Sequence, residues 1–271
     1  MQVAAHTPSI FGIVNITADS FSDGGKFLTA AAAAQHALKL AKDGADVIDL
    51  GAVASNPDAE AVAAAEEIRR LTPLVTVLHE RKIKLSIDSF SSETQAWALE
   101  QNVAWLNDIQ GFADDALYPA LAESRARLVV MHNVVAGKAQ RVETDAHTIF
   151  DRLYAFFDQR VGVLMAAGVA PERIVLDPGM GYFLGKDPAV SLAVLKRLPE
   201  IKARYGLPLF VSVSRKSFIR ALVKVEVDKA GPATLAAELF AAIQGADFIR
   251  THDVAALKQA LTVWNVLNSG R

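Results

Sequence analysis

Short apolar runs alternate with longer segments of helical spacing from one end of the chain to the other. In one such segment Leu71, Leu74, Val75 and Leu78 recur at the three- and four-residue spacing of a single helix face. Nearly continuous apolar strands separated by helices are typical of a parallel sheet whose outer face is covered. The predicted strands cover residues 10–16, 46–50, 84–87, 104–106, 128–131, 174–176, 209–213 and 247–249.

Eight strand–helix units in 271 residues favour a closed architecture. We predict an α/β fold, a (β/α)8 TIM barrel, as a single domain spanning residues 1–271. An open doubly wound sheet is the alternative, because periodicity does not show whether the sheet closes on itself. Apolar residues make up 52% of the chain and charged residues 21%, which excludes disorder of the whole chain and allows a large core.

The net charge of −2 argues against a general nucleic-acid binder. The absence of cysteine excludes disulfides, thiol catalysis and cysteine-based zinc sites. The sequence contains neither a secretory signal pattern nor a stretch of about 18 uncharged apolar residues. We therefore expect a cytoplasmic protein with no nucleic-acid or membrane partner.

Polar side chains follow every one of the eight apolar runs. In a barrel these run ends lie on one face and point into one mouth. A single aspartate in such a place commonly caps the next helix, but a polar residue after all eight runs indicates a clustered site. In chain order the run ends are Asn15, Asp49, Asp88, Asn107-Asp108, His132, Asp177, Ser214-Arg215-Lys216 and Arg250-Thr251-His252.

The charges at these run ends suggest a ligand with two unlike parts. The cations Arg215, Lys216 and Arg250 follow the last two strands, where many barrels bind phosphate. Carboxylates and an amide follow earlier strands and suit a planar heterocycle rich in N–H groups, such as a pterin or a purine edge. The sequence thus predicts a site for a heterocycle that carries a phosphate.

Three further features bear on the loops and helices. Gly179 and Gly181 stand where the backbone after the sixth strand must approach another group closely. Glu66-Glu67 is interpreted as the solvated start of a helix, and Trp264 as a core residue.

Seven short motifs, each at a predicted strand end, give the chain a resemblance to dihydropteroate synthase over nearly its whole length. That family joins 6-hydroxymethyl-7,8-dihydropterin diphosphate to p-aminobenzoate on a (β/α)8 barrel, is usually dimeric and uses Mg2+. The resemblance therefore implies these small-molecule substrates, a Mg2+ cofactor and a homodimer. The motifs occupy residues 12–25, 86–88, 107–108, 131–132, 177–181, 214–217 and 250–253.

The same resemblance implies a role for individual residues. The catalytic set would be Asp88, Lys216, Arg250, His252 and Asn15. The pterin would be bound by Asp88, Asn107, Met131, Asp177, Lys216 and Arg250. The diphosphate would be held by Asn15, Arg250 and His252, with Asn15 also contacting Mg2+. The p-aminobenzoate would be enclosed by Phe21, Ser55, Pro57, Phe183 and Ser217.

Three loops depart from the family pattern and resemble its sulfonamide-resistant (Sul-type) branch. In the first loop, Ala18 replaces the usual proline. The second loop, residues 53–58, lacks the arginine that the family usually has there. The loop at 182–186 is two residues longer than usual and adds an aromatic, Phe183, which we expect at the rim of the p-aminobenzoate pocket. Sulfonamides extend further than the substrate, so a rigid aromatic there would exclude the drug and spare the substrate.

Three other functions stay open from the sequence. A pterin-binding methyltransferase domain shares the barrel and the Asp/Asn set, but has no need of the cations at 214–216 and 250–252. A non-catalytic pterin-binding paralogue would keep binding without turnover. A Schiff-base aldolase would use Lys216 as a desolvated nucleophile.

Overall fold

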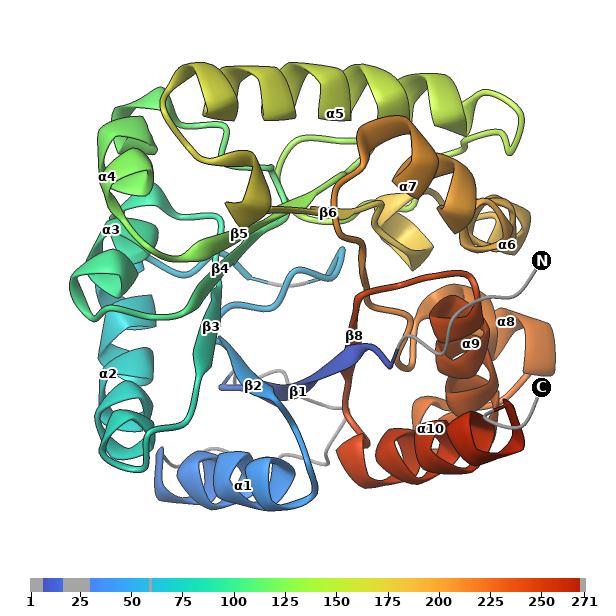
Figure 1. Ribbon diagram of the computed structural model, residues 1–271, viewed down its shortest axis with the longest axis horizontal. Helices are drawn as coiled ribbons and strands as arrows, with labels where there is room; N and C mark the ends of the chain where they lie inside the picture. The colour runs from blue at the N-terminus through green and yellow to red at the C-terminus, as the bar shows by residue number, and fades with distance from the viewer. Residues whose placement is uncertain (1–6, 17–29, 59, 269–271) are drawn as a thin grey trace.

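The computed structural model describes residues 7–16, 30–58 and 60–268, and in it eight parallel strands form one sheet (Figure 1). The strand order is β6-β5-β4-β3-β2-β1-β8-β7, so that chain neighbours are also sheet neighbours and the first strand pairs with the last. The strands are β1 (Ser9–Asn15), β2 (Val47–Gly51), β3 (Leu85–Asp88), β4 (Trp105–Asp108), β5 (Arg127–Met131), β6 (Ile174–Asp177), β7 (Phe210–Val211) and β8 (Phe248–Thr251).

The remaining seam, between β6 and β7, is closed by a short contact. Leu176 and Leu209 form a parallel bridge, and the Leu176 N–H donates to the carbonyl of Pro208 at 2.9 Å. The sheet is therefore a closed barrel, which confirms the predicted (β/α)8 fold and rejects the open sheet. β7 is shorter than the predicted run 209–213. Beyond it, the Ser214 hydroxyl accepts from the His252 N–H at 3.2 Å.

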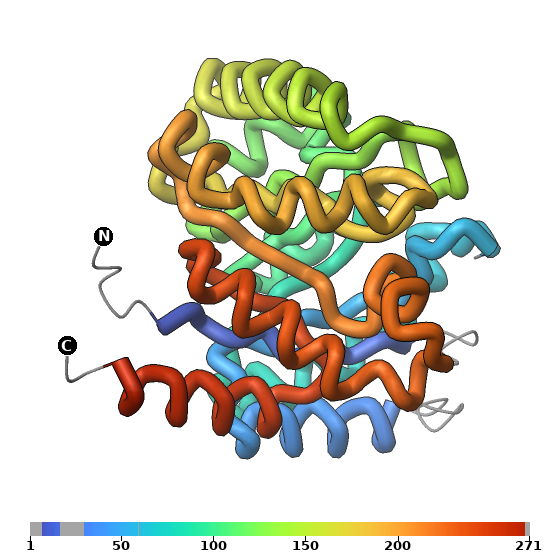
Figure 2. Tube along the Cα trace, turned by 90° about the vertical axis from the view of Figure 1, so that its right-hand side faces the viewer, coloured from blue at the N-terminus to red at the C-terminus, as the bar shows by residue number. Residues whose placement is uncertain are grey.

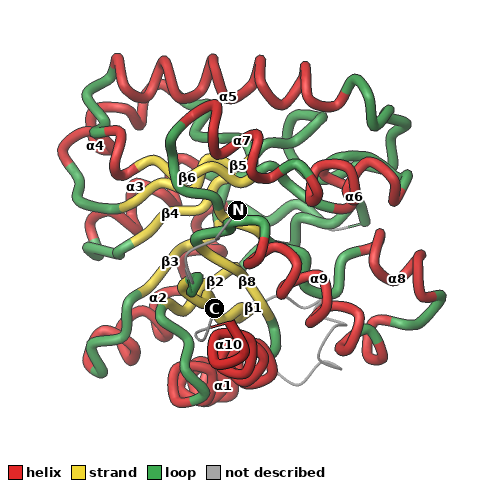
Figure 3. Tube along the Cα trace, turned by 45° about the vertical axis from the view of Figure 1, so that its right-hand side comes forward, coloured by secondary structure: helices red, strands yellow, loops and turns green. Residues whose placement is uncertain are grey.

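Helices cover the outside of the barrel (Figure 3). The first and last helices lie side by side (Figure 2). Both pack on β1: a Cβ added to Gly12 of that strand would lie 3.1 Å from Leu40 of the first helix and 3.2 Å from Val254 of the last. No helix in the described part of the chain is long and apolar enough to cross a bilayer. The helices are α1 (Ala30–Lys42), α2 (Ala64–Glu80), α3 (Ser92–Glu100), α4 (Tyr118–Glu123), α5 (Ile149–Ala166), α6 (Pro188–Lys196), α7 (Leu198–Tyr205), α8 (Ser217–Val223), α9 (Gly231–Ile243) and α10 (Val254–Asn268).

An aromatic plug fills the barrel interior below the strand ends. The ring of Phe11 meets those of Trp105 and Phe210 edge to face at centroid distances of 5.0 and 4.9 Å. The guanidinium of Arg127 lies 4.4 Å from the Trp105 ring centroid. Because alternate residues of a strand point to the same side, the next inward residues lie nearer the mouth. Those of β2, β4, β6 and β8 are polar, namely Asp49, Asn107, Asp177 and Arg250, whereas Ile13 of β1 and Met131 of β5 are apolar.

The helical spacing predicted for α2 is confirmed, since Leu71, Leu74, Val75 and Leu78 are all buried. The prediction that Trp264 belongs to the core was wrong: 38% of it is exposed on α10. Helical spacing shows that apolar residues share a face, but it does not show that another element covers that face.

Candidate active site

Strand pairing brings the predicted heterocycle-binding residues together as two neighbouring pairs at the barrel mouth. Asp88 at the end of β3 pairs with Asn107 of β4, and Met131 at the end of β5 pairs with Asp177 of β6. All four are predicted pterin residues, and Asn107, Met131 and Asp177 are buried. The parallel ladder therefore places these side chains at the carboxyl ends of four successive strands, where barrel active sites lie.

Arg250 is held between two carboxylates inside the barrel. Its Nη2 lies 2.6 Å from Oδ2 of Asp88, and its Nε lies 2.5 Å from Oδ2 of Asp49. Burial opposes the positive charge, but the attraction of Asp49 and Asp88 outweighs it and raises the pKa of Arg250. A guanidinium fixed by two ion pairs has a defined orientation toward anything bound above it.

Three buried groups of the mouth, Asp88, Asp177 and Lys216, have pKa values shifted toward neutral pH. Burial raises the pKa of Asp88 to about 7, with the neighbouring Asp49 adding to the effect and Arg250 opposing it. Burial also raises the pKa of Asp177 to about 6. The pKa of Lys216 is lowered to about 8 by burial and by Arg250. Groups in this state exchange protons readily with a bound heterocycle.

Asn107 offers a buried acceptor to a ligand. Its Oδ1 has no hydrogen-bond partner among the residues that the structure describes. Its backbone carbonyl is already used, because it accepts from the Ser89 N–H at 3.0 Å. Buried polar atoms are nearly always paired in folded proteins, so an unpaired amide oxygen beside Asp88 and Asp177 points to a ligand with N–H donors.

The opposite side of the mouth is cationic. The Nδ1 of His252 lies 2.9 Å from the Ser214 hydroxyl, which fixes the ring next to Arg215 and Lys216. Burial, followed by repulsion from Arg215, Arg250 and Lys216, holds the pKa of His252 well below its usual value. The ring is therefore neutral at physiological pH and serves as a hydrogen-bonding group, while the arginine and lysine side chains supply the charge that attracts an anion.

Asn15 at the end of β1 faces the same mouth. A Cβ added to Gly51 would lie 3.5 Å from Oδ1 of Asn15 and 3.8 Å from Oδ2 of Asp88, so these two oxygens converge over the glycine. Within the described ranges no group of three His, Asp or Glu side chains is placed to hold a metal ion. A hard cation that used Asn15 would therefore need most of its ligands from a phosphate group and water, as Mg2+ commonly does.

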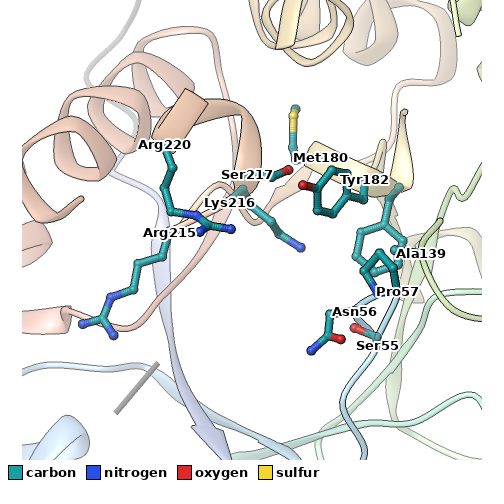
Figure 4. A pocket seen from close by; sticks show the side chains of 11 residues that line it. Ser55, Asn56, Pro57, Ala139, Met180, Tyr182, Arg215, Lys216, Ser217 and Arg220 are labelled. Carbon is teal, nitrogen blue, oxygen red and sulfur yellow. The ribbon is translucent and has the colours of Figure 1, made fainter. Parts of the chain in front are cut away.

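Next to the mouth lies a second compartment, a cavity of about 190 Å³ between four loops (Figure 4). Four of the five residues predicted to enclose p-aminobenzoate line it, namely Ser55, Pro57, Phe183 and Ser217. The fifth, Phe21, lies outside the described residues. The complete lining is Ser55, Asn56, Pro57, Ala139, Met180, Tyr182, Phe183, Arg215, Lys216, Ser217 and Arg220.

Phe183 forms the wall between the two compartments. It is 5% exposed, its ring centroid lies 4.6 Å from Nζ of Lys216, and it packs in one cluster with Met131. The expectation that it stands at the rim was wrong, because its carbonyl accepts from the Val134 N–H at 3.0 Å and draws the segment inward. The neighbouring Tyr182 is the more exposed of the two aromatics.

The two glycines after β6 do have close neighbours, as predicted. Gly179 has a φ of +72°, and a Cβ on it would lie 2.5 Å from the carbonyl oxygen of His132. Gly181 has a φ of +66°, and a Cβ there would meet the Ser217 hydroxyl at 3.0 Å. Glycine at these points lets the loop that carries Phe183 lie directly against the end of β5, at Gly179, and against α8, at Gly181.

Comparisons with known proteins agree with this geometry. The profile of a family described as "Pterin binding enzyme" matches residues 11–252. Dihydropteroate synthase type-2 of Escherichia coli is 54% identical over 254 residues, which cover 94% of each chain. Dihydropteroate synthase type-3 of the same species is 49% identical over 259 residues, 95% of this chain and 98% of the relative. The structure of Xanthomonas albilineans dihydropteroate synthase with 4-aminobenzoic acid matches with a TM-score of 0.89 at 34% identity, covering 98% of this chain and 95% of that one.

The chain belongs to the dihydropteroate synthase family. The predicted family, the barrel fold and the transferase class are thereby confirmed. The relatives named here are synthases, and they lend no support to the methyltransferase or binding-only alternatives.

Two buried acids in this dihydropteroate synthase fold were not recognised as site residues from the sequence. Asp49 was seen only as a polar residue after a strand, although its inward register beside Arg250 makes it part of the site. Glu67 was interpreted as solvated, but it is 2% exposed and accepts hydrogen bonds from Ser89 at 3.0 Å and Thr94 at 2.7 Å. It thus fixes the turn that follows Asp88, a contact between distant segments that helical spacing does not reveal.

Proposed function

We propose that this protein is a dihydropteroate synthase that joins 6-hydroxymethyl-7,8-dihydropterin diphosphate to p-aminobenzoate at the barrel mouth. The arylamine nitrogen bonds to the methylene carbon of the pterin, the C–O bond to diphosphate breaks, and the amine loses one proton. The products are 7,8-dihydropteroate and diphosphate. One observation carries the proposal: Asp88, Asn107 and Asp177 gather on one side of a mouth that is cationic on its other side and opens on a second cavity.

The pterin ring would lie over the acid–amide cluster. Asp88, Asn107 and Asp177 would accept from its N–H groups, and Met131 would pack on its face. Lys216 and Arg250 would flank the ring, each held in place by its attraction to the buried acids. Ionised Asp88 and Asp177 also favour the cationic pterin that forms as the C–O bond lengthens.

The diphosphate would lie against Arg250, His252 and Asn15. The guanidinium donates to the leaving oxygens, and the neutral ring of His252 donates one further hydrogen bond. Asn15, whose Oδ1 converges with Oδ2 of Asp88 over Gly51, would hold a Mg2+ ion, and that ion would supply charge neutralisation at the leaving diphosphate.

The p-aminobenzoate would enter the second cavity with its amine toward the pterin. Pro57 and Phe183 would pack against its ring, and Ser55 and Ser217 would lie at its polar end. A role for Phe21 in closing the cavity stays a prediction. Water held out of this space cannot compete with the amine for the pterin cation.

The assay that tests the proposed function follows diphosphate release from the pterin diphosphate in the presence of Mg2+, with and without p-aminobenzoate. We expect release that depends on the arylamine. Pterin binding without release would favour a binding-only paralogue, and release that ignores the arylamine would contradict a synthase.

Sulfonamide insensitivity is part of the same proposal. The support is the position of Phe183, which is buried beside Lys216 and lines the second cavity. In the same assay we expect turnover to persist in sulfamethoxazole. Inhibition comparable to that of a drug-sensitive synthase would overturn insensitivity and leave the synthase activity intact.

A homodimer, which the resemblance implies, and a cytoplasmic location, which the sequence pattern favours, remain predictions. The homodimer has one supporting feature, an apolar groove between α6, α8 and α9 in which Leu222 and Val223 are 51% and 46% exposed. Sedimentation of the purified protein separates a dimer from a monomer.

A further inference from the structure

The second cavity is cationic at one end and neutral elsewhere. Arg215, Lys216 and Arg220 are the charged side chains among its described lining residues, and all three lie at the α8 end. The remaining lining residues are aromatic, aliphatic, amide or hydroxyl side chains, and none is a carboxylate. The cavity therefore suits a flat ring with an anionic group directed toward α8.

Two of the three cations act on other groups. Lys216 lies against the face of Phe183 and is attracted to Asp177 and Asp88 on the pterin side. Arg215 lowers the pKa of His252 together with burial and the other cations, so its charge is felt at the end of β8. In Figure 4 its side chain extends away from Tyr182 and Pro57.

Arg220 is the remaining cation. It stands three residues after Ser217 on α8, a spacing that puts both side chains on the same face of a helix. Its Nε is buried and has no hydrogen-bond partner in the described part of the chain. Figure 4 shows its side chain extending from α8 toward Lys216. Because the Arg220 side chain lines the cavity, the guanidinium donors that face it are suited to receive an oxyanion.

We propose that Arg220 binds the carboxylate of the arylamine substrate, beside Ser217, and thereby selects an aminobenzoate over an uncharged arylamine. The inference rests on the proposed synthase function and assigns the charge specificity of its second substrate. The amine end of such a substrate points away from Arg220, toward the pterin side. Arg220 is thus a binding residue that stays clear of the reacting carbon.

The test compares p-aminobenzoate with p-aminobenzamide, which has nearly the same shape and no charge. Kinetics are measured for the wild type, Arg220→Gln and Arg220→Lys at saturating pterin diphosphate. A charge-assisted hydrogen bond in a partly buried site corresponds to about 10- to 100-fold in affinity. We expect Arg220→Gln to raise the KM for p-aminobenzoate by that factor with kcat within about threefold, and to leave the benzamide nearly unchanged. Arg220→Lys retains part of the preference.

Lys224→Gln is the matched control, because it removes a charge from the exposed end of the same helix outside the cavity. We expect it to keep the wild-type preference for the benzoate. An undiminished preference in Arg220→Gln overturns the inference, as does an equal loss for both arylamines, which indicates a structural defect. If Arg215→Gln loses the preference for the benzoate and Arg220→Gln keeps it, Arg215 binds the carboxylate. That result also overturns the inference for Arg220. A wild type that releases no diphosphate refutes the proposed function itself.

Discussion

The two compartments of the barrel mouth are built in different ways. The pterin side is made of residues at strand ends, whose positions follow from ladder register, as Asp88 opposite Asn107 shows. The arylamine side is made of loops after β2, β5, β6 and β7, which meet only because they contact one another. Strand ends fix the groups needed for the reaction, while loops are free to change which arylamine or drug is admitted.

The loop-built side is nevertheless tied together. The Ala139 N–H donates to the carbonyl of Ser55 at 3.1 Å, and the Lys186 N–H donates to the carbonyl of Val142 at 2.9 Å. Nη1 of Arg141 lies 2.9 Å from Oδ1 of Asp58. The long connection between β5 and α5 thus joins the loop after β2 to the loop after β6, so that the cavity wall is continuous.

The largest effect is expected at the strand-built side. Asp88→Ala removes a pterin acceptor and one of the two carboxylates that hold Arg250. We expect kcat/KM for the pterin diphosphate to fall by about 1,000-fold or more, since one electrostatic contact alone accounts for about 100- to 1,000-fold. Steady-state kinetics measure it, with circular dichroism as the control for folding. A folded variant with near wild-type rates would remove Asp88 from the site.

A smaller loss of kcat/KM is expected when a change affects only Asp49, the second carboxylate that holds Arg250 in place. Asp49→Asn keeps the shape of the side chain and weakens the ion pair to Nε of Arg250. We expect kcat/KM to fall by about 10- to 100-fold, as for other groups that orient an active residue. The ratio of the Asp49→Asn loss to the Asp88→Ala loss separates positioning from direct contact, and equal losses would contradict that distinction.

On the loop-built side, drug selection is expected to change more than turnover. Phe183→Ala opens the wall beside Lys216. We expect sulfonamide potency to rise by about 10- to 100-fold, because a few kcal/mol of steric clash is removed, while kcat for p-aminobenzoate changes less. Tyr182→Ala, which removes the neighbouring and more exposed aromatic, is the matched control. Equal drug potency in the wild type and Phe183→Ala would contradict the steric explanation.

The pH dependence of kcat/KM for the pterin diphosphate tests the strand-built side, where Asp88 and Asp177 lie. Burial raises the pKa values of Asp88 and Asp177 to about 7 and about 6, so both lose their charge as the pH falls through this range. We expect kcat/KM for the pterin diphosphate to decline below pH 7, approaching about tenfold per pH unit for each group. The KM for p-aminobenzoate should vary less over the same range. A flat profile between pH 7 and 5 would contradict the role of ionised acids.

The smallest effect is expected at the exposed ion pair that joins the loop after β2 to the connection between β5 and α5. Arg141 and Asp58 are 51% and 72% exposed, and exposed ion pairs contribute little. We expect Arg141→Gln to raise the KM for p-aminobenzoate by less than about threefold and to leave the pterin parameters unchanged. A large loss of pterin turnover would show that the two compartments are coupled through the loops.

The sequence predicted the strand-built side better than the loop-built side, for a physical reason. Strand period and the carboxyl-end rule place Asp88, Asn107 and Asp177 without any knowledge of tertiary contacts. The burial of Phe183 and the burial of Glu67 depend on contacts between distant segments, such as Val134 with Phe183. The role of Asp49 could have been predicted, because this residue points into the barrel from β2 and a buried acid requires a hydrogen-bond or ion-pair partner.

The most direct test of the account is the stoichiometry of the wild-type reaction in a single assay. Dihydropteroate and diphosphate are measured together, starting from the pterin diphosphate, p-aminobenzoate and Mg2+. A mouth that holds the pterin over Asp88 and Asp177 and keeps water away predicts one dihydropteroate for each diphosphate released. Diphosphate released in excess, with hydrolysed pterin in place of dihydropteroate, would contradict it.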